Sequence, residues 1–177
     1  MGAVNQSVID FAKKNVKKQV GKNGTCWDLA EEALKASGAQ TSKDFGKVTA
    51  SANYKWGTPV VLSQVQPGDI IQFKDHKVII VTTKVTKLPD GRVITEKRTE
   101  VHKRGHHTAI AASSAVDGMV TVFEQHVNGT TVVTPNNVNF ENRTTVKTDD
   151  NVTTTTKITV IGHFWFYRPV GVLAKHF

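Results

Sequence analysis

The chain of 177 residues contains one cysteine, two methionines and five prolines, and it has fewer acidic than basic residues. A single cysteine cannot form an internal disulfide, so the fold does not depend on an oxidising compartment. No run of about 18 apolar residues occurs, and we therefore expect no membrane-spanning helix. The length is that of one domain, long enough to bury a core without covalent staples.

The first 20 residues lack the uninterrupted apolar segment and the small-residue cleavage site of a secretory signal. We expect a soluble protein that is cytoplasmic as written, or secreted if a signal has been removed. A monomer is expected.

The formal net charge of +8 favours anionic partners, including anionic polymers, although it would also serve solubility alone. Basic residues gather at 13–22 and at 97–104. Neither cluster is interleaved with aromatic residues, which are the stacking platforms of single-stranded nucleic-acid sites. Nucleic acid is therefore not an expected partner.

Hydrophobic periodicity predicts two helices, over residues 5–20 and from about residue 26 to residue 37. Residues 39–58 are predicted to form a loop. From about residue 59, short runs rich in Val, Ile and Thr alternate with turn pairs such as Asp90-Gly91 and Asn128-Gly129. Helices followed by antiparallel strands indicate an α+β fold, with N-terminal helices packed on an antiparallel sheet or half-barrel.

Cys26, in the stretch TCWDLAEEAL, stands where the second predicted helix begins. The unpaired N–H groups and the positive dipole end of a helix start stabilise a thiolate, so Cys26 is a candidate nucleophile. The alternative is a small hydrophobic side chain buried at the helix end.

Two later segments offer partners for a reactive thiol, because such a thiol needs a base and the base needs a polar group to orient it. The segments are GHHTAIAA at 105–112 and VFEQH at 122–126. On adjacent antiparallel strands, His107 and Glu124 would come side by side. His126 would share a face with Glu124.

Four histidines remain. We predict that His76 and His102 lie at the surface, and that His163 and His176 lie near the C-terminus. We expect no metal and no cofactor. His106 and His107 would point to opposite faces of one strand, and a structural zinc site would need more cysteines.

Four motifs follow one another along the chain: the Cys26 helix start, PGDIIQF, HHTAIAA and VFEQH. In this order they resemble the CHAP family, which belongs with the NlpC-type branch of papain-like cysteine hydrolases. The resemblance covers about residues 8–170. It implies a single CHAP-like domain over 1–177, with a charged β-hairpin inserted at about 78–105.

The resemblance also implies the roles of individual residues. Cys26 would be the nucleophile, His107 the base and Glu124 the orienting acid. Where this chain departs from the family pattern, His106 becomes a reserve base and His126 a supporting residue. Three aromatic residues would line the substrate cleft: Trp27, Tyr54 and Trp56.

The expected function is that of a thiol hydrolase, an amidase or endopeptidase that cleaves amide bonds in peptidoglycan-like or peptidyl substrates. The alternative is a non-catalytic module that binds peptide or glycan on the same scaffold. A reactive thiol distinguishes the first from the second.

Overall fold

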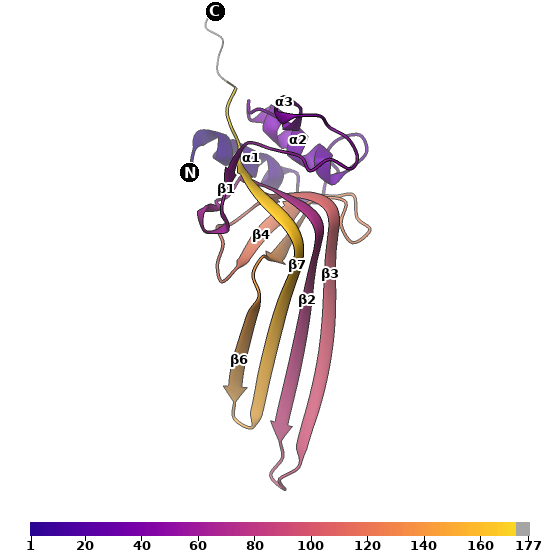
Figure 1. Cartoon of the computed structure of the whole chain (residues 1–177), viewed down its shortest axis with the longest axis vertical. Coiled ribbons are helices and arrows are strands. Elements are labelled where there is room, and N and C mark those ends of the chain that lie inside the picture. Colours follow the sequence, from indigo (N-terminus) through magenta and orange to yellow (C-terminus); the bar gives the residue numbers. More distant parts are fainter. Residues whose placement is uncertain (173–177) are drawn as a thin grey trace, which may run out of the picture.

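The computed structural model describes residues 1–172. Its helices gather at one end of the molecule, and long strands extend from that end as an arm (Figure 1). The helices are α1 (Ala3–Lys14), α2 (Cys26–Ala36), α3 (Ser42–Phe45) and the 3-10 helix η1 (Leu62–Gln64). The strands are β1 (Thr58–Val60), β2 (Ile70–Lys87), β3 (Val93–Ala111), β4 (Met119–Glu124), β5 (Thr134–Asn139), β6 (Arg143–Asp149) and β7 (Val152–Arg168).

The seven strands of residues 1–172 form one antiparallel sheet in the order β1-β7-β2-β3-β4-β5, and β6 pairs with β7. The predicted order of helices followed by antiparallel strands is confirmed, and the α+β class with it. None of the described helices has both the length and the hydrophobicity needed to cross a membrane.

The first helix is shorter than its sequence pattern predicts. It ends at Lys14, because Asn15 leaves the helical conformation and Lys17 has a φ of 66°. Val16 then forms a bridge with Val133, so it is held by a strand-like contact rather than by a helical turn. The prediction of a helix as far as residue 20 was wrong, because an apolar residue at every fourth position also suits an extended segment that packs on the core.

The second helix begins where the sequence predicts, at Cys26. Thr25 is its N-cap: the Thr25 hydroxyl accepts from the Asp28 N–H (3.1 Å), and the Asp28 carboxylate accepts from the Thr25 N–H (3.0 Å). This capping box satisfies two N–H groups that would otherwise lack partners. Leu29 and Leu34 are buried on the face that packs against the sheet.

Two hydrophobic clusters lie in the part of the molecule that holds the helices. One joins α1 and α2 to the sheet through Ile70 and Ile110, with Trp56 fully buried among them. The other gathers aromatic rings, among them the stacked pair Phe73 and Phe140, whose centroids are 5.8 Å apart. The sheet is therefore covered by helices on one face and by packed aromatic rings on the other.

An irregularity in β2 marks where the arm begins. The register with β7 shifts between Lys74 and Lys77, and Asp75 has a φ of 52°. Opposite it, Gly162 has a φ of 98°, and a Cβ atom there would lie 2.1 Å from the Asp75 carbonyl oxygen. Only glycine fits at this position. We call residues 77–104 and 143–161, beyond this bulge, the arm.

Strands β2 and β3 form the hairpin expected at 78–105, and the Leu88 N–H donates to the Arg92 carbonyl (2.8 Å) at its turn. The second hairpin, β6 and β7, pairs alongside β2, so the arm has four strands (Figure 1). That the hairpin is an insertion into a single CHAP-like domain stays a prediction.

His76 is buried at the bulge, and the prediction of a surface position was wrong. Its side chain is 1% exposed and packs against the rings of Phe73, Phe140 and Phe164. Nε2 donates to the Asn139 carbonyl (3.2 Å), and within the described chain Nδ1 has no partner. Burial, together with the nearby Arg104 charge, lowers the pKa of His76 to about 4.

This low pKa predicts a specific loss of stability in mild acid. The unfolded chain binds a proton near pH 6.5, whereas folded His76 resists it down to about 4, so stability is lost as the pH falls between these values. Two to three pKa units correspond to about 3 kcal/mol. In urea unfolding, the free energy of unfolding of the His76→Phe variant should not show this decrease between pH 6.5 and about 4. His102→Phe, which removes an exposed imidazole, is the control and should behave as wild type.

Candidate functional site

The thiol of Cys26 occupies the first turn of α2 and is half-buried. The His107 side chain and the backbone of Thr108 and Trp27 lie close enough to its sulfur to lower the pKa of the thiol. Thr108 follows His107 on β3, next to the point where β4 begins to pair with that strand at Ala109. One strand therefore places both an imidazole and a backbone group beside the sulfur.

The imidazole of His107 connects the thiol to a carboxylate. Its Nε2 lies 2.8 Å from Oε2 of Glu124, at the end of the neighbouring strand β4. An ionised carboxylate only accepts hydrogen bonds, so Nε2 carries the proton and donates. Nδ1 is then the ring nitrogen left for the thiol. The structure brings His107 beside Glu124, as their strand positions predict, and it places the Cys26 thiol next to His107.

Glu124 is fully buried and accepts hydrogen bonds from three side chains. Arg104 binds both oxygens, with Nε 2.9 Å from Oε2 and Nη2 2.6 Å from Oε1. The Asn136 amide donates to Oε1 at 2.8 Å. With His107 on Oε2, both oxygens are fully used, which fixes the carboxylate in one orientation.

The electrostatics of the three groups favour an ion pair. Burial opposes the charge on each, but the surrounding contacts outweigh it. The pKa of Glu124 falls to about 2 despite burial, because Arg104 and His107 stabilise its charge. The pKa of His107 rises to about 9 despite burial, through its bonds to Cys26 and Glu124. Burial would raise the pKa of Cys26, yet His107 and the Thr108 and Trp27 backbone lower it.

A comparison with known protein families finds one to which this chain is similar over nearly its whole length. The model of the AIM3/BBC1 cysteine proteinase-fold domain matches residues 2–174. The chain belongs to this family. No curated protein and no solved structure gave a significant match. The chain therefore has the papain-like cysteine proteinase fold, as its motifs predict.

Two polar residues of this AIM3/BBC1 domain were missed in the sequence because they looked like surface or loop residues. Arg104 seemed to belong to an exposed basic cluster, but it is 7% exposed and paired with Glu124. Asn136 lies on β5, which no strong strand pattern marks. The sequence did indicate a partner such as Arg104, because a carboxylate buried at position 124 needs a cationic group or a hydrogen-bond donor beside it.

The residue next to Glu124 also has a positioning role that the sequence did not reveal. Gln125 is fully buried. Its amide pairs with the Val20 backbone, accepting at 2.7 Å and donating at 2.9 Å, and it also donates to the Thr25 carbonyl (2.8 Å). It thus ties the strand of the carboxylate to the helix start of the thiol.

Neither supporting histidine occupies its expected place. The ring of His106 is directed to the Ala52 carbonyl and packs edge-on against Tyr54, so the reserve-base assignment is not supported by position. His126 is exposed, with a φ of 61°, because β4 ends at Glu124 and the chain turns there. The alternation that would place His126 beside Glu124 no longer applies, and Asn136 supports the carboxylate instead.

The three aromatic residues expected in a cleft differ in their surroundings. Tyr54 lies close enough to Cys26 for the thiolate charge, after burial, to raise the pKa of the phenol. Trp27 is half-buried and donates from Nε1 to the Ser42 hydroxyl (3.0 Å). Trp56 is fully buried and donates to Gln72 (3.0 Å), so its assignment to an open cleft was wrong.

A metal site would require several ligands to converge. Among the described residues, no group of three or more His, Cys, Asp or Glu side chains has this arrangement.

Proposed function

We propose that this domain is a thiol hydrolase that cleaves amide bonds in peptidyl substrates. The observation that supports the proposal most is the His107 imidazole, which is hydrogen-bonded to Glu124 and lies close enough to the Cys26 sulfur to lower the pKa of the thiol. Nucleophile, base and orienting acid stand in the order that thiol catalysis needs. The half-buried sulfur stands at a helix start, where an anion is stabilised.

In the proposed first step, His107 holds the proton of the Cys26 thiol and the thiolate attacks the carbonyl carbon of the substrate amide. The carbonyl π electrons move to oxygen, and the resulting oxyanion is stabilised by N–H groups at the start of α2. The protonated imidazole then transfers its proton to the leaving amine, and the C–N bond breaks. The products of this step are a free amine and a thioester on Cys26.

In the second step, neutral His107 accepts a proton from a water molecule, which attacks the thioester carbonyl. The C–S bond breaks, and the acid product leaves Cys26 as a thiolate beside protonated His107. Glu124 stays ionised throughout and holds the Nε2 proton, which keeps Nδ1 available to the sulfur. Arg104 and Asn136 prevent the carboxylate from rotating away.

The substrate class is proposed at the level that the residues support. The finer proposal, of a CHAP-type amidase or endopeptidase that acts on peptidoglycan-like substrates, is based on the four sequence motifs alone. The family description names a fold and no substrate. We therefore propose peptidyl amides, with peptidoglycan stem peptides as one member of that class.

Alkylation by iodoacetamide tests the site directly, because Cys26 is the only thiol in the chain. An ordinary thiol, with a pKa of about 8.5, loses about 25-fold in rate between about pH 9 and about pH 7 as its thiolate is protonated. Wild-type Cys26 should lose much less, since its pKa is lowered. His107→Ala should restore a steep dependence, because burial then raises the thiol pKa with no imidazole to oppose it.

His106→Ala is the matched control, one residue away on the same strand, and it should leave the wild-type profile unchanged. If wild-type Cys26 titrates like an ordinary thiol, the hydrolase proposal fails and the binding module is favoured. If His106→Ala has the effect expected of His107→Ala, the base has been assigned to the wrong histidine.

A further inference from the structure

One face of the arm carries positive charge only. Directly paired residues share a face of a sheet, and alternate residues along a strand point the same way. We call the face that includes Lys77 the lysine face. Its members on β2 and β3 are Lys77, Ile79, Val81, Thr83, Val85, Lys87, Val93, Thr95, Lys97, Thr99, Val101 and Lys103. Its members on β6 and β7 are Thr144, Val146, Thr148, Thr153, Thr155, Lys157, Thr159 and Ile161.

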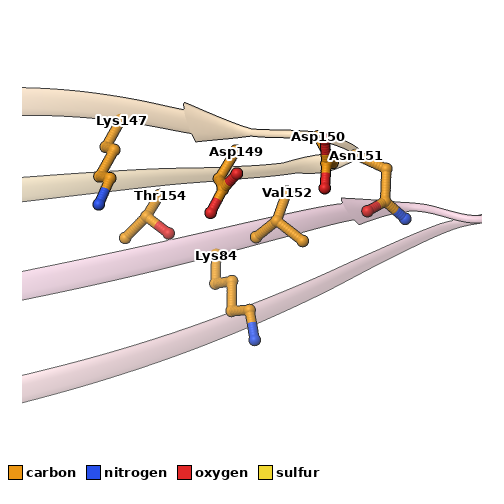
Figure 2. Close-up of a pocket in the computed structure, with 7 residues that line it drawn as sticks. All are labelled: Lys84, Lys147, Asp149, Asp150, Asn151, Val152 and Thr154. Atoms are coloured by element: carbon orange, nitrogen blue, oxygen red, sulfur yellow. The ribbon is translucent and has the colours of Figure 1, made fainter.

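The opposite face of the same strands balances its own charge. Lys84 lies 3.9 Å from Glu96, and Arg98 lies 3.1 Å from Glu100. Near the tip, a hollow of about 370 Å³ is lined by both signs of charge, from two lysines and two aspartates (Figure 2). Its lining residues are Lys84, Lys147, Asp149, Asp150, Asn151, Val152 and Thr154.

The lysines of the lysine face have no salt-bridge partner among the described residues. Aliphatic side chains between them are exposed: Val146 by 65%, Val93 by 57% and Val101 by 50%. Single exposed valines are ordinary, but a sheet face that combines them with uncompensated lysines is a surface suited to a partner.

A hollow of about 280 Å³ lies at the base of this face, next to the bulge. Lys77, Lys103 and Ile161 border it, together with Gly105, and Asp75 is the one carboxylate on its rim. Around Gly105, nothing lies within 4 Å of the place that a Cβ atom would occupy. A side chain of a bound partner could insert here, which is how interfaces often gain an anchor.

We propose that the lysine face docks an extended acidic segment of a partner protein, with aliphatic side chains between its carboxylates. Five lysines without a carboxylate complement such a segment and would repel the same face of a second copy. The arm contains no Phe, Tyr or Trp, so it lacks the platforms on which bases stack and the aromatic residues typical of membrane interfaces. An acidic protein segment therefore fits better than nucleic acid or lipid.

Fluorescence anisotropy with a labelled synthetic peptide of Glu and Val in equal number tests the proposal. Cys26→Ala protein is used, so that binding is measured independently of any turnover. Lys97→Gln/Lys157→Gln should weaken binding about tenfold, because both lysines lie on the lysine face. Lys84→Gln/Lys147→Gln removes the same net charge from the opposite face and should change the dissociation constant less than about twofold.

Equal weakening by the two double variants would overturn the proposal, because binding would then follow net charge rather than the face. So would equally tight binding of a peptide with Lys in place of Glu. Phosphatidylserine vesicles and an oligothymidine strand serve as the remaining probes. If either binds through Lys97 and Lys157 while the Glu/Val peptide does not, the partner is of another class and the acidic-segment proposal is wrong.

Discussion

Replacing Cys26 with alanine should abolish amide hydrolysis while leaving the fold intact. The variant lacks the only thiol in the chain, so no acyl-enzyme can form and His107 has no thiol to deprotonate. Loss of a catalytic nucleophile typically lowers kcat by about 10⁴-fold or more. The measurement is mass spectrometry of a peptide pool incubated with wild-type and variant protein, which detects new termini without knowledge of the preferred bond.

The same variant must be shown to fold. Cys26 is half-buried and alanine is well tolerated in a helix, so the urea midpoint should change little. A variant that is folded and still cleaves would contradict the nucleophile assignment. His107→Ala should also be inactive, whereas the neighbouring His106→Ala should retain wild-type cleavage. A wild-type protein that leaves the pool uncut would favour the binding module.

The candidate site could be predicted from the sequence wherever local chemistry determines geometry. Thr25 and Asp28 specify where α2 begins, so the position of Cys26 at the helix start follows from four residues. His107 and Glu124 come together because β3 and β4 are successive antiparallel strands joined by a short connection. A turn and a capping box depend on neighbouring residues alone, so the start of α2 and the pairing of β3 with β4 could be predicted from the sequence.

Prediction failed where a strand departs from regular alternation. Asp75 takes a left-handed conformation at the bulge, and from there His76 turns inward with the phenylalanines instead of outward to solvent. Arg104 lies opposite His76 and is buried with it. A bulge of this kind is set by a long-range pairing with Gly162 on β7, and no local pattern around residue 75 reveals it.

The ends of strands caused the other errors. His126 was placed beside Glu124 by extending β4 two residues too far, and its expected role is taken by Asn136 from a strand that turn signals alone did not identify. The arm shows the same limit. The β2–β3 hairpin was recognisable from its Asp90-Gly91 turn, but the pairing of β7 with β2, which joins this hairpin to that of β6 and β7, depends on tertiary contacts.

Replacing Arg104 with leucine should have the largest effect on stability. Glu124 would remain fully buried, and it would lose the two-pronged ion pair that compensates its charge. Removing one partner of a buried pair typically costs about 3–5 kcal/mol, because the remaining charge is left uncompensated. Urea unfolding near neutral pH should show this decrease. Asn136→Ala removes one neutral donor from the same carboxylate and should cost only about 1 kcal/mol.

The pH dependence separates an electrostatic effect from lost packing. In wild type the pKa of Glu124 is about 2, below its ordinary value of 4.5, so its contribution is present above 4.5 and is lost as the pH falls towards 2. Without Arg104 that pKa rises, and protonation relieves the buried charge of the variant. The difference in unfolding free energy between wild type and Arg104→Leu should therefore become smaller as the pH is lowered from 4.5 towards 2. A difference that stays constant would show that the arginine acts by packing, and a variant as stable as wild type would show that Glu124 does not depend on it.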